Sequence, residues 1–390
     1  MSINVQIIQP AVPSYRLDLF DELYNIDKFN VSIDACEIDD VGVQSVSGGR
    51  EYIDLHYIIK KYLFGKIVWQ HGLQLSCKLK TGDVLIVNGN PRYLSNLPLI
   101  ISAKRRGIAV IWWGHGWTAG GKKWRAWLRK KYMCIADSIL LYTKDEADQF
   151  ISEGFDANNV AYLNNTINTI PILKYSSQWK ESDAITLKDK YGIQNDRIML
   201  FCGRLTKKSK LDLCFLALST LLKDDNKNIK LVIIGGGPCA EEYKNMSVKY
   251  GVQDHVIWLG EIYSDTEKAP WFMISDIFTY PGAIGLSLIE SFAYGLPVVT
   301  HNNRLNQMPE IAALKDGFNG YVFTEGDGYD LARVIIKSFS NDEKLYSLGK
   351  AAQKTVIEEY GFTDMLNRFV QAIEKASNLV ANKRRINSGG

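Results

Sequence analysis

The sequence predicts an α/β protein of two doubly wound domains in series. Its 390 residues are too many for one ordinary hydrophobic core. In both halves short apolar strands alternate with helical segments, which is typical of parallel sheets covered by helices on both faces. A polar stretch between the halves lacks clear periodicity. We therefore predict an N-terminal domain, a linker, a C-terminal domain, and a terminal helix packing back across the domains with a disordered tail, at residues 1–170, 171–190, 191–360 and 361–390.

Composition excludes several classes of protein. The hydrophobic share of 46% and charged share of 23% are those of a soluble globular protein, and the net charge of +3 gives no nucleic-acid signature. The six cysteines are scattered without a CxxC pair, which argues against a zinc site or a disulfide framework. No run of 18 apolar residues exists, and the N-terminus predicts a strand, not a signal peptide. We expect a cytoplasmic protein, with peripheral contact at the inner face of the plasma membrane left open.

The expected elements place several loops where ligands bind. Ligands of doubly wound sheets bind at the carboxyl ends of the strands. The expected strands are 5–8, 29–34, 83–87, 108–113 and 138–142, then 198–201, 231–234, 256–259, 277–280 and 298–300. The expected helices are 18–24, 144–153, 211–222 and a terminal helix around 363–376.

The segment 279–310 carries the strongest functional pattern. Gly285 and Leu286 open a short apolar helix that contains one carboxylate, Glu290. A carboxylate in apolar surroundings is costly without a partner, and its Cβ leans toward the helix N-terminus, where free N–H groups collect. The amides suit an anion and the carboxylate suits a hydroxyl pair, which together suit a sugar nucleotide. The alternative is that Glu290 only caps or pairs locally.

A basic loop follows the strand 198–201. It sets four cations at the carboxyl edge of the sheet: Arg204, Lys207, Lys208 and Lys210. Such groups would neutralise a diphosphate and stabilise it as a leaving group. The alternative is an ordinary solvated loop.

A glycine-rich turn follows the strand 231–234. Residues 235–240 fit G-x-G-x-x-A, and Glu261 lies about 20 residues further, which formally matches a dinucleotide fingerprint. Pro238 and the position in the second half favour a plain tight turn instead.

His115 lies between two glycines after the strand 108–113. At the carboxyl end of a strand it could donate to a substrate oxygen or to a phosphate. A lone histidine is equally consistent with a structural role.

A basic helix is expected directly after this loop. Residues 122–132 hold six cations and no acid, with Trp124, Trp127 and Leu128 at helical spacing. Such a helix suits an anionic bilayer, although its tryptophans could instead belong to the core. The residues assigned to membrane contact are Lys122, Lys123, Trp124, Trp127, Arg129, Lys130 and Lys131.

Read together, these motifs resemble the GT-B glycosyltransferases of retaining family 4, the glycosyl transferases group 1, of the bacterial polysaccharide and O-antigen type. The matching pieces occur in the expected order over residues 198–323, and the match in the first half is looser. They are the sequences at 203–205, 231–235, 259–260, 285–290, 295–299, 309–310 and 317–320. The resemblance implies the GT-B fold, in which two Rossmann-like domains face one another across a cleft.

The resemblance implies roles for individual residues. Glu290 would hold the donor ribose, the amides of Gly285 and Leu286 would contact the pyrophosphate, and Arg204 with a nearby lysine would neutralise it. His115 would lie near the transferred sugar and the acceptor. The implied catalytic set is His115, Arg204, Lys208 and Lys210. The implied donor-binding set is Glu290, Gly285, Leu286, Gly282, Asn165, Gly260, Ile262 and Glu310.

Two positions depart from the family pattern. Gly282 stands where the family usually has a second glutamate that contacts the donor sugar. Ser209 stands where a lysine usually follows Gly-Arg-Leu, but Lys208 and Lys210 flank it, and a lysine stem from either could reach the same phosphate.

The resemblance implies sugar transfer with retention from a UDP-, GDP- or dTDP-sugar, the departing phosphate helping to take the acceptor's proton. No Asp-x-Asp motif is found where a metal would hold the diphosphate, so we predict that no metal or other cofactor is needed. The expected acceptor is a lipid-linked or oligosaccharide glycan at an anionic membrane surface. The alternatives are a non-catalytic sugar-nucleotide-binding subunit and a nicotinamide-dependent enzyme.

Overall fold

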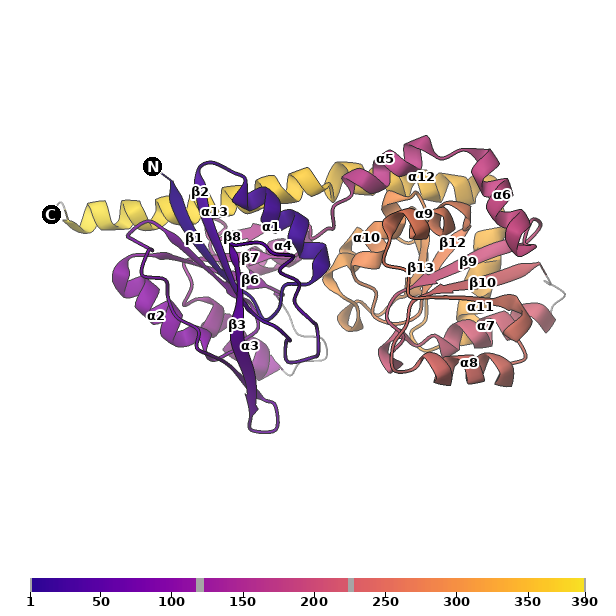
Figure 1. Cartoon of the computed structure of the whole chain (residues 1–390), viewed down its shortest axis with the longest axis horizontal. Helices are drawn as coiled ribbons and strands as arrows, with labels where there is room; N and C mark the ends of the chain where they lie inside the picture. Colours follow the sequence, from indigo (N-terminus) through magenta and orange to yellow (C-terminus); the bar gives the residue numbers. More distant parts are fainter. Residues whose placement is uncertain (1, 117–122, 224–227, 389–390) are drawn as a thin grey trace. The chain divides into compact units, whose positions relative to one another are not determined.

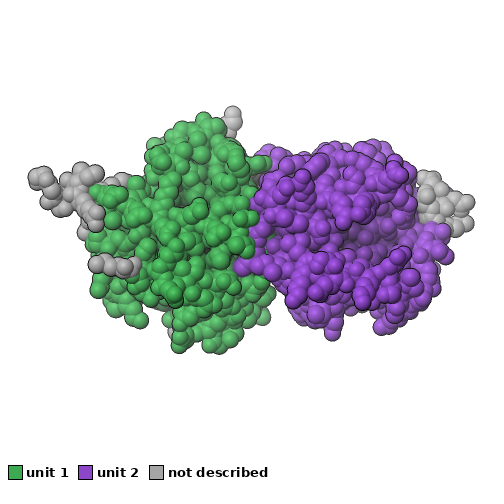
Figure 2. Space-filling view, turned by 90° about the horizontal axis from the view of Figure 1, so that it is seen from above, with its two compact units in different colours: residues 1–168, 363–390 green, residues 169–362 purple. Residues whose placement is uncertain are grey.

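The chain forms two α/β units, each with its own sheet and core (Figure 1). Unit 1 comprises residues 1–168 and 363–390, and unit 2 comprises residues 169–362 (Figure 2). The computed structural model describes residues 2–116, 123–223 and 228–388, without the side chains of residues 56, 123–126, 128 and 383–388.

Unit 1 is built on an eight-stranded sheet in the order β4-β3-β2-β1-β5-β6-β7-β8. The neighbouring strands pair in parallel, except that β4 runs antiparallel to β3. The strands are β1 Ile3–Ile8, β2 Phe29–Cys36, β3 Ile53–Tyr62, β4 Ile67–His71, β5 Val84–Asn88, β6 Ala109–Gly114, β7 Ser138–Leu141 and β8 Val160–Tyr162. The helices are α1 Leu17–Tyr24, α2 Asn96–Arg106, α3 Lys123–Met133, α4 Lys144–Ser152 and α13 Phe362–Ser388, with a 3-10 turn η1 at Ser14–Arg16.

Two neighbouring tryptophans in β6 show why helices cover both faces of this sheet. Successive side chains of a strand point to opposite faces. Trp112 packs edge-on against Tyr132 of α3, with the ring centroids 4.7 Å apart. Trp113 packs against Phe20 of α1 at 6.3 Å and Phe369 of α13 at 5.0 Å. The apolar run of β6 is therefore buried on both sides, as its sequence predicts.

Unit 2 is built on a six-stranded, fully parallel sheet in the order β11-β10-β9-β12-β13-β14. The strands are β9 Arg197–Cys202, β10 Ile229–Ile234, β11 Val256–Gly260, β12 Ile277–Tyr280, β13 Val298–His301 and β14 Gly320–Phe323. The helices are α5 Ile170–Gln178, α6 Glu181–Tyr191, α7 Asp212–Lys223, α8 Ala240–Lys249, α9 Asp265–Ile274, α10 Leu286–Ala293, α11 Gly328–Phe339 and α12 Asp342–Glu359. Four 3-10 turns complete it, η2 Lys207–Ser209, η3 Gln253–His255, η4 Arg304–Asn306 and η5 Pro309–Ala313.

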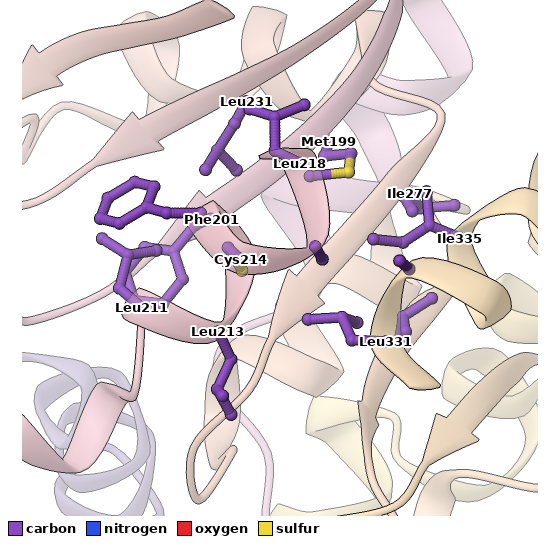
Figure 3. Close-up of a cluster of buried hydrophobic side chains, with 14 of the residues drawn as sticks. Met199, Phe201, Leu211, Leu213, Cys214, Leu218, Leu231, Ile277, Leu331 and Ile335 are labelled. Carbon is purple, nitrogen blue, oxygen red and sulfur yellow. The ribbon is translucent and has the colours of Figure 1, made fainter. Parts of the chain in front are cut away.

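One face of the second sheet carries the main core of unit 2. Met199 and Phe201 of β9 and Leu231 of β10 pack with Leu218 of α7 and Ile335 of α11, all at most 1% exposed (Figure 3). A fully buried leucine, isoleucine or phenylalanine stabilises a fold by about 1.5–3 kcal/mol. This cluster fixes the strands whose ends form the candidate site.

The structure differs from the sequence-based expectations in three places. Residues 171–190, expected as a linker, form most of α5 and α6 within unit 2; α6 buries no side chain, so it carries no apolar period that sequence inspection could detect. The terminal helix α13 continues to Ser388, where a disordered tail was expected. The hairpin β3–β4 was not predicted.

Candidate functional site

The candidate site of unit 2 lies where the strand order reverses. β9 is the first strand of this sheet, β10 and β11 follow on one side, and β12 lies on its other side. Ligands of open α/β sheets bind at such a switch point, outside the carboxyl ends of the two strands. The loop after β9 carries Arg204, and the loop after β12 leads to Gly285. The structure thus brings together two segments that the sequence separates by about 80 residues.

The cations of the loop after β9 have different surroundings. Arg204, Lys207 and Lys208 are exposed. Lys210 has left-handed backbone (φ 50°), and its Nζ lies 3.0 Å from Glu325 Oε1. Arg204, Lys207 and Lys208 therefore present their charge to solvent, whereas Lys210 is already paired.

Ser209, at the position where the family pattern usually has a lysine, is hydrogen-bonded within its own turn. It is 1% exposed, its Oγ accepts from the Thr206 N–H at 2.9 Å, and it donates to the Thr206 carbonyl. The hydroxyl thus closes the turn that displays Lys207 and Lys208.

Gly282 lies against the backbone of this turn. A Cβ at Gly282 would come within 2.0 Å of the Lys208 carbonyl oxygen and 3.0 Å of the Ser209 carbonyl carbon. No side chain fits at position 282 unless the turn moves. The loop after β9 therefore fills the space that the Cβ of a glutamate at position 282 would occupy.

Glu290 on α10 forms an ion pair that sequence reasoning missed. Its Oε1 lies 2.5 Å from Nζ of Lys268 on α9, and the two side chains are only 12% and 16% exposed. Burial lowers the pKa of Lys268, but attraction to Glu290 outweighs it, so the pKa is raised overall. Cys202, at the end of β9, lies near this pair: burial and Glu290 raise the pKa of its thiol to about 12. Glu290 is therefore partnered and lies at the carboxyl end of β9.

The N-terminus of α10 is contacted by residues that follow β13. Its N-cap is Gly285, no side chain caps it, and its first turn carries no acid. Gln307 accepts from the Ile284 N–H at 2.7 Å and donates to Thr300 Oγ1 at 2.9 Å. A Cβ at Gly285 would lie 3.9 Å from Oε2 of Glu310, which places Glu310 beside this N-terminus. The amides near Gly285 and Leu286 thus lie at a helix N-terminus that no side chain caps, with Glu310 beside it, and their contact with a pyrophosphate stays a prediction.

The glycine-rich turn after β10 packs against the protein's own backbone. A Cβ at Gly235 would lie 2.0 Å from the Gly203 carbonyl oxygen, and one at Gly237 would lie 2.6 Å from that of Leu205. Their lack of side chains is explained by this close approach between two loops, which is the plain tight-turn interpretation. Gly260 (φ 71°) ends the neighbouring strand β11 and half-buried Ile262 follows it; both belong to the implied donor-binding set.

His115 in unit 1 follows the end of β6, and its side chain is partly buried. Burial, helped by Arg129 and Arg16, lowers its pKa to about 4. The ring packs edge-on against Tyr142 at 4.6 Å, and the His115 carbonyl accepts from the Arg129 guanidinium at 2.7 Å. Arg16 lies over the Trp113 ring at 5.0 Å. His115 is therefore neutral near pH 7, in an electropositive setting.

The predicted basic helix corresponds to α3, and two of its cations face the protein. Arg129 donates to the carbonyls of His115 and Gly89, so it does not lie on an exposed basic face. Lys130 pairs with Glu153 of unit 1. Trp127 is 58% exposed, with Lys131 Nζ 5.8 Å from its ring centroid, so this tryptophan is not core. Lys122 and the side chains of Lys123 and Trp124 lie outside the described residues.

Asn165 lies at the end of unit 1. It is 3% exposed, and its N–H donates to the Tyr142 carbonyl at 2.8 Å. The preceding Asn164 has left-handed backbone (φ 50°) and accepts from the Lys144 N–H at 3.0 Å. Asn165 is thus fixed by the backbone next to the ring that packs on His115.

Three residues that contact the candidate site escaped prediction: Lys268, Gln307 and Glu325. Each acts through contacts with segments distant in sequence, so no local pattern identifies it. Among the described residues, no group of three or more His, Cys, Asp or Glu side chains could hold a metal ion.

Comparison with known proteins agrees with this geometry. The family model described as Glycosyl transferases group 1 matches residues 183–355, which include the whole switch-point site. This segment, which is less than half of the chain, is similar to the glycosyl transferases group 1 family.

Two curated relatives of this segment are named for glycolipids. Alpha-monoglucosyldiacylglycerol synthase of Streptococcus pneumoniae is 30% identical over 189 residues, 47% of this chain and 41% of that protein. The GDP-mannose-dependent alpha-(1-6)-phosphatidylinositol monomannoside mannosyltransferase of Mycolicibacterium smegmatis is 24% identical over 184 residues, 45% of this chain and 47% of that protein. The alignments thus span less than half the length of these two relatives.

Solved structures show that the fold extends over the whole chain. A glycosyltransferase from Rickettsia africae ESF-5 superposes with a TM-score of 0.72, covering 96% of this chain and 98% of that one at 14% identity. Anabaena HepE, solved in complex with UDP, superposes with a TM-score of 0.70, covering 95% and 99% at 12% identity. At this identity the likeness shows the fold, which is GT-B.

Proposed function

We propose that this chain is a retaining glycosyltransferase that moves a sugar from a nucleotide diphospho-sugar to a glycan or lipid-linked acceptor in bacterial surface polysaccharide biosynthesis. The observation that carries the proposal is the switch point of unit 2. There the exposed guanidinium of Arg204, the N-terminus of α10 without a side-chain cap, and the partly buried carboxylate of Glu290 follow neighbouring strands. A diphosphate needs cations and free amides, and a ribose needs a carboxylate, so these groups together suit the nucleotide part of a sugar donor.

In this mechanism the leaving group is stabilised by side chains. Arg204 with Lys207 or Lys208 neutralises the diphosphate as its bond to the anomeric carbon breaks, and the departing phosphate helps to take the acceptor's proton. Lys210 contributes less than its sequence position suggests, because Glu325 holds its ammonium group. Cationic side chains supply the charge that a metal would otherwise supply, so the reaction is proposed to be metal-independent.

The proposed acceptor is linked to a lipid or to a growing glycan. One relative is named as a synthase of monoglucosyldiacylglycerol, and another is named as a mannosyltransferase for phosphatidylinositol monomannoside. In unit 1, neutral His115 lies beside Arg16 and Arg129, and this positive charge suits an acceptor that carries phosphate. His115 accepts or relays a hydrogen bond there without adding charge.

Thermal shift and transfer assays with UDP-, GDP- and dTDP-sugars test the proposal. A bound donor raises the melting temperature by mass action. Glu290→Gln is expected to raise the donor KM strongly, and Arg204→Ala to lower kcat by ~10²-fold or more. Arg333→Ala, which removes an exposed arginine of α11, is the matched control. Unchanged donor binding in Glu290→Gln, or wild-type turnover in Arg204→Ala, would contradict the assigned roles.

Membrane contact by α3 is part of the proposal and has its own test. Trp127 is exposed next to Lys131, so Trp127→Ser with Lys131→Glu removes one apolar and one basic contact without disturbing the Lys130–Glu153 pair. We expect cosedimentation with anionic vesicles to fall. Equal binding of wild type and variant to the vesicles would contradict the proposal that α3 contacts the membrane.

A second candidate function is a non-catalytic sugar-nucleotide-binding subunit. It is favoured by Gly282, which leaves no carboxylate and no room for one where the family usually contacts the donor sugar. Donor binding without hydrolysis or transfer across the panel would support this alternative. A nicotinamide-dependent enzyme, the third candidate, would show a change of cofactor fluorescence on binding.

A further inference from the structure

The hairpin β3–β4 of unit 1 ends in an exposed apolar tip. The strands pair from Ile58↔His71 to Tyr62↔Ile67, and the strand labelled β3 runs into this loop in Figure 1. Phe64 is fully exposed (103%), and Leu63 is 65% exposed. We call residues 62–66, Tyr62 to Lys66, the hairpin tip. Large apolar side chains gathered at a projecting loop mark an interaction site.

The backbone of the hairpin tip is strained in order to present these side chains. Leu63, Phe64 and Gly65 have φ angles of 49°, 54° and 77°, and the Lys66 N–H donates to the Leu63 carbonyl at 3.1 Å. Positive φ at both central residues is the type I′ turn, in which Asn-Gly is strongly preferred and a bulky side chain is an outlier. Asparagine at position 64 would satisfy the turn better than phenylalanine. Strain of this kind persists where the side chain serves a function.

The charge around the hairpin tip selects the partner. Residues 55–82 contain no aspartate or glutamate, while Lys60, Lys61 and Lys66 surround the apolar residues and are all exposed. An anionic bilayer attracts such lysines and buries the apolar residues between them. A second copy of this chain would place the same lysines against one another, which disfavours self-association through the tip.

The base of the hairpin is fixed to the unit, so the tip is held outward. The Val68 N–H donates to the Arg92 carbonyl at 2.8 Å, and the Leu94 N–H donates to the Val68 carbonyl at 3.2 Å. The Arg92 guanidinium donates to the Gly65 carbonyl and pairs with Asp40 at 3.1 Å. A preorganised loop loses little conformational entropy when it binds.

We propose that the hairpin tip inserts Leu63 and Phe64 into the interface of an anionic membrane, with Lys60, Lys61 and Lys66 at the headgroups. This membrane site is distinct from α3. It is also independent of the donor site, so vesicle binding and donor binding can fail separately.

The test is cosedimentation of the full chain with vesicles of phosphatidylglycerol and phosphatidylcholine in equal parts, and of phosphatidylcholine alone. We expect wild type to bind the anionic vesicles and to be released by salt. The double variant Leu63→Asn/Phe64→Asn is expected to bind about 100-fold more weakly, since two large apolar side chains no longer leave water. Its melting temperature is expected to equal or exceed that of wild type, because asparagine tolerates left-handed backbone. Val248→Asn, at a 62% exposed valine of unit 2, is the matched control and is expected to bind like wild type.

Hydrogen exchange on the wild-type protein gives a second measurement that needs no variant. Anionic vesicles are expected to slow amide exchange at residues 60–67. Wild-type binding by the double asparagine variant, or unchanged exchange at the tip, would overturn the proposal. A third result would also overturn the proposal: the wild-type protein sediments as a dimer, the double variant sediments as a monomer, and neither protein binds vesicles. The hairpin tip would then be a contact between copies of this chain.

Discussion

Replacing Lys268 by methionine tests the ion pair at the centre of the candidate donor site. Its Nζ lies 2.5 Å from Glu290 Oε1, and both side chains are less than one-fifth exposed. Removing one member of a buried pair leaves an uncompensated charge and costs ~3–5 kcal/mol. Because both groups keep some contact with water, we expect Lys268→Met to lower the free energy of unfolding by about 2–4 kcal/mol. For a unit of this size that corresponds to about 5–15 °C in Tm.

A double-mutant cycle decides whether the loss comes from the pair. Lys268→Met with Glu290→Gln removes both charges, so the double variant is expected to be more stable than Lys268→Met alone. Asp265→Asn is the control: Asp265 also contacts Lys268, at 3.2 Å, but its side chain is 71% exposed, and such pairs contribute about 1 kcal/mol or less. Urea unfolding of the four proteins measures the cycle. Single-variant losses that add within ~0.5 kcal/mol would show that Glu290 does not depend on Lys268.

Three further predictions concern packing and pH. Gly282→Ala is expected to cost about 1–3 kcal/mol in denaturant unfolding, because its Cβ would overlap the Lys208 carbonyl oxygen; wild-type stability would show that the turn yields freely. Hydrogen bonds from Asn306 and Lys210 lower the pKa of Glu325 to about 2, so the contribution of Glu325 to stability is complete above about pH 5 and is lost as pH falls toward 2. The difference in free energy of unfolding between wild type and Glu325→Gln should therefore shrink as pH falls over that range. A constant difference would count against the lowered pKa. His115, with its pKa lowered to about 4, is expected to stay neutral by NMR between pH 5.5 and 8 and to reduce stability as pH falls below about 6.5; titration near pH 6.5 would disprove its burial.

The fold was predictable where strands are buried on both faces. β12, Ile277–Tyr280, was predicted with its observed bounds, and β10 and β13 within two residues, because continuous apolar runs between turn residues have few other interpretations. The α5–α6 segment was not predictable, since α6 packs no buried residue against the sheet. The hairpin β3–β4 was missed because several of its apolar residues, among them Ile58, Leu63 and Phe64, are exposed, which departs from the usual pattern of a strand.

The sequence by itself determined that Arg204, Gly285 and Glu290 lie at the carboxyl ends of parallel strands, because alternating strands and helices allow little else. Only the tertiary structure decided their partners. Lys268 reaches Glu290 from a different helix, and the backbone of Lys208 fills the space beside Gly282. Such contacts join segments far apart in the chain, so they depend on how helices and loops pack together and not on any local pattern of residues.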